Sequence, residues 1–471
     1  MVCVKSNEIE VLKLEQCIDF TALHVVNPQR YPFILESSAH AEDILSENNI
    51  KDSQNSNKNA RYDILFAFPL ESLTLYSDNT LTGNILDAQK DFLSNLDLNF
   101  SKEKLNVKTS QSQYPFTGGW FVYLSYEMAA QIETRLELPQ SKNKTITAKL
   151  SRIPVAIIYD HNNDSQTIIA EKKHKDKISE IIDDIKSCNN KSVLPNKNNL
   201  RLNEEPAEQY LNAIRKVKDY IAEGDVFQVN LSRLWETKNV TSIDPINLYK
   251  SLKLANPAPF SAYAYYDELK IISSSPERLV QVNDSKVQTR PIAGTRPRKN
   301  ETSADIDNLK ELIAHPKERA EHIMLIDLER NDLGRICVPG SIHVNELMCL
   351  ESFQHVHHIV SNVVGELKDG TTPADIIRAV FPGGTITGCP KERCMQIIAE
   401  LEAKPRGAYT GSLGYINHGG NMDLNILIRT FELSSDELRL RAGAGLVTDS
   451  IAENELAETR IKAKGLLEAL N

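Results

Sequence analysis

The sequence predicts an α+β fold. Its candidate strands and helices come in runs instead of strict alternation, which favours antiparallel sheets over a doubly wound α/β fold. Residues 205–222 carry apolar side chains at positions 207, 211, 214, 217 and 221, the spacing of an amphipathic helix. Residues 226–235 alternate instead, and this pattern places Phe227, Val229 and Leu231 on one face of a predicted strand. Both periodicities therefore occur within one stretch of chain.

The first half of the chain is expected to be rich in strands. The predicted elements are strands at 62–68 and 155–160 and a helix at 176–186. Two polar stretches rich in Asn, Lys and Ser, at 46–59 and 187–199, are expected to be a solvated loop and a linker. The linker predicts a boundary between a β-rich domain at 1–199 and a second domain at 200–471.

The second half contains more elements, with clearer boundaries. Gly224 follows the helix at 205–222 and is expected to end it in a left-handed conformation. Apolar and β-branched runs predict strands at 261–266, 270–275, 278–282, 286–290, 411–417, 423–433 and 437–447. Helical spacing predicts helices at 303–314, 316–330, 373–380, 390–403 and 451–470.

Composition excludes several classes of function. A net charge of -10 without a basic tract argues against nucleic acid as a partner. The seven cysteines are scattered and lack C-x-x-C spacing, which indicates reduced thiols. No window approaches 18 uncharged apolar residues, and the N-terminal residues lack an apolar signal core, so neither a membrane span nor a signal peptide is expected. We therefore predict a cytoplasmic enzyme.

Two short motifs carry a family resemblance. Residues 273–278 read Ser-Ser-Ser-Pro-Glu-Arg, and residues 290–295 read Arg-Pro-Ile-Ala-Gly-Thr. Together they resemble the active-site core of the chorismate-utilising enzymes, which include the anthranilate, aminodeoxychorismate, isochorismate and salicylate synthases. The resemblance implies antiparallel sheets packed as a sandwich and flanked by helices. It makes Glu277 the general acid/base and Thr295 a substrate contact, although Glu277 taken alone would be an ordinary carboxylate in a turn.

Ala293 excludes one mechanism. In many aminodeoxychorismate synthases the middle residue of Pro-Ile-X-Gly-Thr is a lysine that bonds covalently to substrate. Alanine cannot act as a nucleophile, and its small side chain leaves room for a free one. The resemblance therefore indicates a subclass that keeps its intermediate noncovalently.

Two pairs of glutamates are the candidate metal ligands. Glu318 and Glu321 share one helix face, and Glu455 and Glu458 share a face of the last helix with Lys462. From spacing alone such pairs are most often solvated helix surface. The resemblance implies instead that they hold Mg²⁺, a cation that prefers oxygen ligands, against the ring carboxylate of chorismate.

Further residues match substrate-binding positions of the family. Arg429 lies in a segment predicted as an apolar strand, where it would clamp a carboxylate unless it forms a structural ion pair. The small residues Gly443, Ala444 and Gly445 would let backbone amides approach a carboxylate. The resemblance adds substrate contacts from Thr385, Tyr409 and Lys462. The glycine-rich segment 381–391 lacks a Gly-Lys-Ser/Thr ending, so we exclude nucleotide binding.

His358 matches a histidine beside the substrate ring. Clustered histidines such as His355, His357 and His358 occur in zinc sites, but their spacing here fits no common zinc motif. We expect one functional histidine with two ordinary neighbours.

Gln228 points to ammonia as the nucleophile. Isochorismate and salicylate synthases place a lysine there to activate water, which glutamine cannot do. No Gly-x-Cys-x-Gly motif with a downstream His-x-Glu occurs, so ammonia is expected from a separate glutamine amidotransferase subunit.

The product is less firmly indicated than the substrate. Residues 227–232, 381–388, 31–33 and 119–121 resemble aminodeoxychorismate synthase component I, of folate biosynthesis, and we favour that branch. Ala293 alone resembles anthranilate synthase component I, which is the alternative. A non-catalytic chorismate or tryptophan sensor is a remote third. Leu35, Glu36 and Ser37 resemble a tryptophan pocket found in both enzymes.

Overall fold

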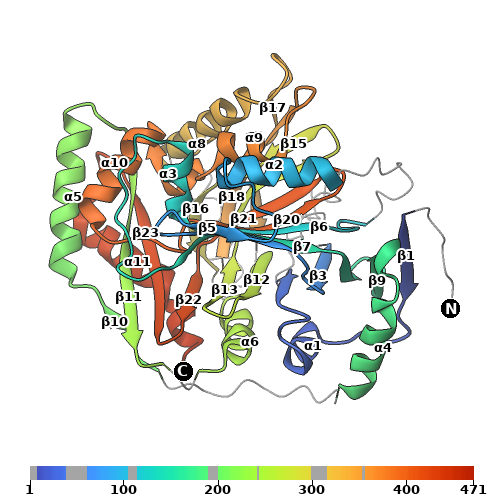
Figure 1. Cartoon of the computed structure of the whole chain (residues 1–471). Coiled ribbons are helices and arrows are strands. Elements are labelled where there is room, and N and C mark those ends of the chain that lie inside the picture. Colours follow the sequence, from blue (N-terminus) through green and yellow to red (C-terminus); the bar gives the residue numbers. More distant parts are fainter. Residues whose placement is uncertain are drawn as a thin grey trace, which may run out of the picture.

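The computed structural model describes residues 8–38, 61–103, 114–188, 200–240, 243–298, 316–352 and 356–471. The side chains of residues 295–297, 316, 317 and 356 lie outside this description. The described residues form two large antiparallel sheets with helices on their outer sides (Figure 1). The predicted α+β class is therefore confirmed.

The first sheet, sheet A, has 12 strands among the described residues. In spatial order they are β1 (Ile9–Lys13), β9 (Ser165–Glu171), β8 (Val155–Asp160), β3 (Tyr62–Ala67), β2 (Phe33–Glu36), β12 (Phe260–Tyr265), β13 (Leu269–Ser275), β22 (Thr430–Ser434), β23 (Glu437–Leu446), β11 (Gln228–Lys238) and β10 (Asn203–Glu204). The short strand β19 (Gly388–Cys389) also pairs with β11.

The second sheet, sheet B, has 11 strands in the described part of the chain. Their order is β16 (Ile292–Pro297), β18 (Val356–Glu366), β15 (Lys286–Thr289), β14 (Arg278–Asn283), β21 (Met422–Ile426), β20 (Ser412–Asn417), β6 (Gly119–Leu124), β7 (Ile146–Ile153), β4 (Ser72–Tyr76) and β5 (Leu81–Gly83), with β17 (His343–Ser352) paired to β18.

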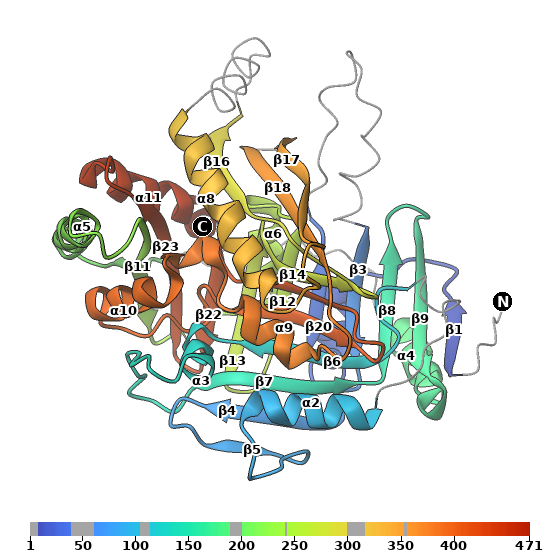
Figure 2. The ribbon, with the colours of Figure 1, turned by 90° about the horizontal axis from the view of Figure 1, so that it is seen from above.

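Helices cover the outer faces of both sheets. They are α1 (Phe20–Val26), α2 (Phe92–Glu103), α3 (Ala129–Ile132), α4 (Lys177–Ser187), α5 (Ala207–Ala222), α6 (Pro245–Ala255), α8 (Pro316–Gly334), α9 (Pro373–Val380), α10 (Lys391–Glu402) and α11 (Ala452–Glu468). In Figure 1, α2, α8 and α9 lie along the top of the molecule and α1, α4 and α6 along the bottom. Figure 2 shows α5, α10 and α11 grouped at one end.

The side chains of each strand alternate between two apolar layers. In β6, Phe121 and Tyr123 point into the core between the sheets, whereas Trp120, Val122 and Leu124 join the core beneath the helices. Phe33 of sheet A stacks on Phe121 of sheet B with ring centroids 4.1 Å apart. Because both faces of such a strand are buried, its sequence is apolar throughout instead of alternating.

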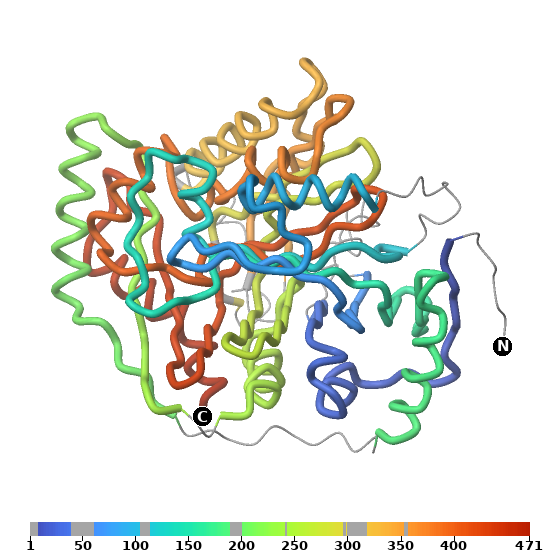
Figure 3. The backbone as a smooth tube through the Cα atoms, viewed as in Figure 1, coloured from blue at the N-terminus to red at the C-terminus, as the bar shows by residue number. Residues whose placement is uncertain are grey.

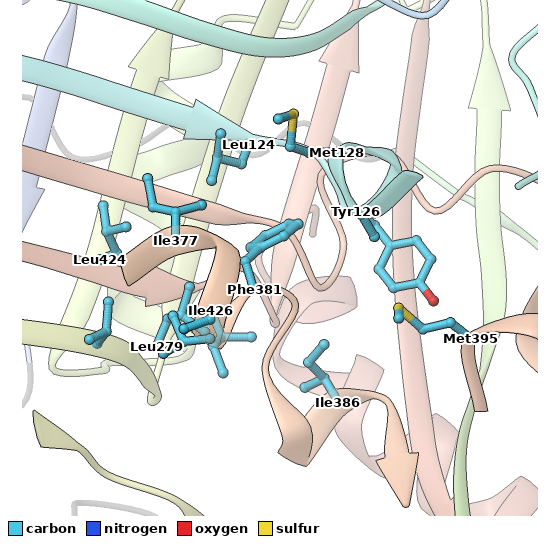
Figure 4. Packing of buried hydrophobic residues seen from close by; sticks show 14 of the residues in the cluster. Leu124, Tyr126, Met128, Leu279, Ile377, Phe381, Ile386, Met395, Leu424 and Ile426 are labelled. Atoms are coloured by element: carbon cyan, nitrogen blue, oxygen red, sulfur yellow. The ribbon is translucent and has the colours of Figure 1, made fainter. Parts of the chain in front are cut away.

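The apolar layer outside sheet B also supports the loop that precedes α10. Figure 4 shows Phe381 and Ile386 of this loop packed among side chains of β6, β14, β21 and α9. Ile386 belongs to a short 3₁₀ helix, η5 (Gly384–Ile386), which therefore has its own apolar anchor. Thr385, in the middle of η5, is held in place by this packing.

Two of the places where the chain passes between the sheets lie next to each other. The chain leaves sheet A for sheet B between β13 and β14, at Glu277, and returns between β21 and β22, at Arg429. The Ile426 N–H donates to the Glu277 carbonyl over 3.0 Å, and the Ser274 N–H donates to the Arg429 carbonyl over 3.1 Å. These bonds tie the crossings into one corner that carries both side chains.

Three details differ from the predictions made from sequence. The single strand predicted at 423–433 is split into β21 and β22, because the chain changes sheets between them. Arg429 therefore lies in a turn, with a left-handed φ of 51°, and not in a strand. Phe227 precedes β11 and is 68% exposed, so it does not share the buried face of Val229 and Leu231. The helix predicted at 303–314 lies outside the described residues.

Other predicted elements agree with the structure. Gly224 follows α5 with a φ of 83°, as expected of a helix terminator.

Strands from both sides of residue 200 occur in both sheets, and Figure 3 shows the N-terminal and C-terminal segments side by side at the centre. The predicted domain boundary therefore does not coincide with a division between sheets. No helix in the described ranges is long and apolar enough to span a membrane.

Candidate active site

Glu277 lies at the corner where the chain passes between the sheets. Its side chain is 5% exposed, and its Oε1 atom has no hydrogen-bond partner among the described residues. Burial raises the pKa of Glu277 to about 7, while the Thr385 side chain, the Ile292 N–H, Lys462 and Arg429 act in the opposite direction. A carboxyl with this pKa can both donate and accept a proton near neutral pH.

Arg429 faces Glu277 across the same corner. Its guanidinium forms no hydrogen bond or ion pair with the described residues. Burial lowers the pKa of Arg429 to about 10, although the charge of Glu277 partly offsets this effect. A guanidinium that loses water without gaining a partner is costly in a folded protein, and a planar carboxylate would satisfy it through two hydrogen bonds. The structural ion pair considered as an alternative is not present in the described part of the chain.

A bulge between β16 and β18 shapes the wall beside Glu277. Ala293 pairs with Ile359 and Thr295 pairs with His358, so Gly294 is the extra residue, at a left-handed φ of 71°. Ala293 is buried, and the side chain of Thr295 lies outside the described residues. The bulge therefore places a small residue directly after Ile292, whose N–H bonds to the Glu277 carboxyl.

His358 is the histidine of this wall. Burial, together with the nearby charge of Arg429, lowers its pKa to about 3, so the ring is neutral near neutral pH. A hydrogen bond with the Gly294 backbone orients the ring. The His357 ring contacts a different residue, since its Nδ1 lies 2.6 Å from the Ser352 hydroxyl. His355 lies outside the described residues.

The strands β11 and β23 form a second wall. Asn230 pairs with Gly445 and Ser232 pairs with Gly443. A Cβ atom at Gly445 would lie 2.3 Å from Gln228 Nε2, and one at Gly443 would lie 2.7 Å from the Tyr409 hydroxyl. A side chain at position 443 would also meet the Leu231 carbonyl at 2.7 Å, whereas one at 445 would have to displace the Gln228 amide; Ala444 between them is fully buried.

Gln228 and Lys462 border the glycine segment. The Gln228 amide donates to Glu321 Oε1 over 2.8 Å, and its buried Oε1 has no partner among the described residues. Lys462 donates to the Gly443 carbonyl over 3.0 Å and pairs with Glu458 at 2.7 Å. Because Lys462 also acts on the pKa of Glu277, the two walls belong to one site.

The loop before α10 closes the site from the side of η5. The Asn230 amide donates to the Thr385 carbonyl over 3.2 Å, and the Asn230 N–H donates to the Thr387 carbonyl over 2.9 Å. The side-chain oxygens of Asn230 and Thr385 are buried. Thr385 therefore lies between β11 and Glu277, and its contact with substrate stays a prediction.

The four predicted metal ligands lie on two helices at the edge of this site. Glu321 of α8 reaches Gln228 and Gly445, and Glu455 of α11 is buried, whereas Glu458 is half exposed beside Lys462. The described residues contain no cluster of three or more His, Cys, Asp or Glu side chains placed to hold a metal. Mg²⁺ commonly uses one or two carboxylates together with water and substrate, and this set of oxygen ligands fits that pattern. The ligand assignment stays a prediction.

The support beneath Tyr409 was not evident from the sequence. The buried Glu402 binds the guanidinium of Arg406 at 2.7 Å and that of Arg441 at 3.1 Å, and accepts hydrogen bonds from Ser232. Glu127 accepts the N–H groups of residues 406 and 407, and Glu432 accepts that of residue 408. These contacts fix the segment that carries Tyr409. Most of them join residues far apart in sequence, such as Glu127 and residue 406, so no local pattern indicated them.

Leu35, Glu36 and Ser37 lie at the end of β2, away from Glu277 in the sheet order. Glu36 accepts hydrogen bonds from Lys253 at 2.6 Å and from the Tyr249 hydroxyl at 2.7 Å, and the Ser37 N–H donates to Asp63. Tryptophan binding at this segment stays a prediction.

This geometry agrees with what comparisons with known proteins identify. The family model described as chorismate binding enzyme matches residues 50–468. The chain therefore belongs to the chorismate binding enzyme family. Its relatives include an anthranilate synthase component I-like protein of Synechocystis, 41% identical over 77% of this chain and 75% of the relative. Aminodeoxychorismate synthase component 1 of Bacillus subtilis is 40% identical over 78% of this chain and 80% of the relative.

Solved structures agree with the fold. Anthranilate synthase component I from Streptococcus pneumoniae superposes with a TM-score of 0.77 at 30% identity, over 90% of this chain and 94% of the other. The isochorismate synthase MenF of Escherichia coli has a TM-score of 0.72 at 17% identity, over 98% and 95% of the two chains, which concerns the fold alone. Both comparisons support the sandwich of antiparallel sheets.

Proposed function

We propose that this chain is an aminodeoxychorismate synthase component I, which replaces the C4 hydroxyl of chorismate with an amino group and keeps the enolpyruvyl group on the ring. The observation that carries the proposal is the pair at the sheet crossing, a buried Glu277 whose pKa burial raises to about 7, near an Arg429 guanidinium without a partner among the described residues. The arrangement suits a substrate that is an anion and has a hydroxyl leaving group.

Each side chain has a role in this reaction. Arg429 and the backbone around Gly443 bind carboxylate, and the neutral His358 contacts the ring. Glu277 donates its proton to the leaving hydroxyl, which departs as water, and takes a proton back from the incoming nitrogen. The atoms balance as chorismate plus ammonia giving aminodeoxychorismate plus water.

Ala293 supports a noncovalent route. Ammonia would add first at C2 with loss of the C4 hydroxyl, and a second ammonia would then add at C4 as the first leaves. The buried Ala293 leaves space for ammonia, and Gln228, with a free buried carbonyl oxygen, can accept a hydrogen bond from it. Neither group can form a covalent adduct with the ring.

Mg²⁺, held by glutamates of α8 and α11, would neutralise the ring carboxylate. Ammonia would come from a separate glutamine amidotransferase subunit. Folate biosynthesis, by way of p-aminobenzoate, would use the product.

Product analysis tests the proposal. Purified protein is mixed with chorismate, Mg²⁺ and ammonium at mildly alkaline pH, and the products are separated and identified by mass spectrometry. We expect aminodeoxychorismate without free pyruvate. Anthranilate with an equal amount of pyruvate would instead establish anthranilate synthase, which the relatives of that name and Ala293 make the second candidate. Binding of chorismate without turnover would point to a sensor.

A further inference from the structure

Two amide side chains lie next to each other on the wall formed by β11 and β23. Gln228 and Asn230 are two positions apart on β11, so both project from the same face of the strand. A Cβ atom at Gly445 of β23 would stand 2.3 Å from Gln228 Nε2. A Cβ atom at Gly443 would stand 3.0 Å from Asn230 Oδ1. The two glycines therefore leave room for the two amides in the site.

The hydrogen bonds of the two amides fix which way each one points. Gln228 Nε2 donates to Glu321 Oε1 over 2.8 Å. Asn230 Nδ2 donates to the Thr385 carbonyl over 3.2 Å. A carboxylate and a carbonyl only accept hydrogen bonds, so the NH₂ ends must face these groups and the amide oxygens must turn away from them. Both amide oxygens are buried and have no partner in the described part of the chain.

The oxygen of Asn230 lies beside predicted substrate contacts. The Tyr409 hydroxyl would stand 2.7 Å from the same Cβ atom at Gly443, so this hydroxyl and Asn230 Oδ1 border one place in the site. A buried oxygen without a donor is unfavourable, so Oδ1 is expected to gain a hydrogen bond when the site is filled. The carboxylates and the ether of chorismate only accept, so the available donors are its C4 hydroxyl and the incoming ammonia.

The loop that binds Asn230 also packs against the corner that carries Glu277. The Asn230 N–H donates to the Thr387 carbonyl of this loop over 2.9 Å. A Cβ atom at Gly383 of the same loop would lie 2.8 Å from the Ile426 side chain. The Ile426 N–H in turn donates to the Glu277 carbonyl over 3.0 Å. Asn230 and Glu277 are therefore joined through one short loop.

The neighbours of the two amide oxygens indicate different positions on the substrate ring. Gln228 is bonded to Glu321, a candidate ligand of the ion that would hold the ring carboxylate on C1, and C2 is the carbon next to C1. Asn230 is bonded to Thr385, whose side chain lowers the pKa of Glu277, the proposed acid for the hydroxyl on C4. Because C4 lies opposite C1 on the ring, the donor to Asn230 is expected at C4.

We propose, building on the proposed function, that Asn230 is a specificity-determining residue, whose Oδ1 accepts a hydrogen bond from the ammonia that attacks C4 and so directs the second addition. In this step the nitrogen forms its bond to C4, the ring double bonds shift, and the C2–N bond breaks. The incoming nitrogen loses one proton and the departing nitrogen gains one, so the atoms balance without another reactant. Loss of Oδ1 slows this second addition, whereas the first, served by Gln228, continues.

The variant Asn230→Leu tests the proposal, because leucine has nearly the shape of asparagine and no acceptor. Protein, chorismate, Mg²⁺ and ammonium are mixed, and the isomers with the amino group at C2 and at C4 are separated by chromatography. We expect the ratio of the C2 isomer to the C4 isomer to rise about tenfold relative to wild type, since one hydrogen bond of ordinary strength changes a rate by about this factor. A merely structural role would lower both products together and leave the ratio unchanged.

Asn212→Leu is the matched control, since it makes the same replacement at an exposed asparagine of α5 and should leave the ratio unchanged. Asn230→Val is a second variant that also lacks the acceptor, and valine suits a strand. It should give the same shift in the ratio, and the midpoint of thermal unfolding shows which variants are folded. An isomer ratio equal to that of wild type in either folded Asn230 variant would overturn the proposal.

Supplying the C2 isomer directly separates this inference from the proposed function. The isomer is incubated with isotope-labelled ammonium, and labelled aminodeoxychorismate is measured, so that only the second addition is followed. We expect Asn230→Leu to be about tenfold slower than wild type. Equal rates would refute the role of Asn230 even though chorismate is aminated as proposed. If wild type instead gives anthranilate and pyruvate, the proposed function fails, and the role of Asn230 at C4 fails with it.

Discussion

Replacing Glu277 by glutamine should make the protein less active and, above neutral pH, more stable. The pKa of Glu277 is raised by burial from 4.5 to about 7, so between these values the folded state keeps a proton that the unfolded chain has lost. Stability must therefore fall as pH rises through this window. One pKa unit is worth about 1.36 kcal/mol, so the total loss is about 3 kcal/mol, of which about 2 kcal/mol falls between pH 5.5 and 8.

Glutamine has no proton to lose, so the variant escapes this penalty. We expect the free energy of unfolding of Glu277→Gln, relative to wild type, to increase by about 2 kcal/mol from pH 5.5 to pH 8. Urea unfolding followed by the fluorescence of the buried Trp120 and Trp235 measures it at both pH values. At both pH values the amination rate of Glu277→Gln should be about 10²- to 10⁴-fold lower than that of wild type, which is the usual contribution of a general acid.

Glu392→Gln, which removes an exposed carboxyl from the first turn of α10, is the control, and its stability relative to wild type should not change with pH. A stability difference for Glu277→Gln that is the same at pH 5.5 and 8 would refute the reasoning, because Glu277 would then ionise as readily in the folded state as in the unfolded chain. Retained activity would refute the assignment of Glu277 as general acid.

Two further predictions test the walls of the site. Arg429→Lys should raise KM for chorismate at least about tenfold, because lysine keeps the charge but cannot bind a carboxylate through two parallel hydrogen bonds. The unfolding midpoint of this variant should not fall. An unchanged KM would show that Arg429 does not bind substrate. Gly445→Ala should lower kcat at least about tenfold, since the new methyl group would stand 2.3 Å from Gln228 Nε2 and displace it. Gly419→Ala is the control, because nothing lies within 4 Å of a Cβ atom at that position. Equal activity of both variants would contradict the proposed role of Gln228 in binding ammonia.

Much of the fold followed from local patterns in the sequence. The helical spacing in 205–222 and the glycine after it predicted α5 and its end, because both depend on residues within a few turns of one another. The α+β class followed similarly from the order of elements. Glu277 was identified by its motif, and its burial in the structure supplies the physical reason for the unusual pKa that the chemistry needs.

The sequence patterns of the strands predicted fewer details of the fold than those of the helices, because several strands are buried on both faces. All six residues of β6 are buried, so its sequence could not show which side chains face the other sheet and which face the helices. The split between β21 and β22 was missed for a related reason. An apolar run continues through the point where the chain changes sheets, and the turn is made by Arg429, a residue that seldom adopts a left-handed conformation.

Tertiary structure alone decided which distant groups meet. Gln228 donates to Glu321 across 93 positions of sequence, and Leu328 and Glu329 of α8 pack against Gly384 in the loop before α10. Periodicity reports the environment of one element at a time, whereas the pKa of a buried acid depends on charges brought near it by other elements. The sequence therefore determined the elements and the chemical types available, and the packing of the two sheets and their helices determined which of those groups share a site.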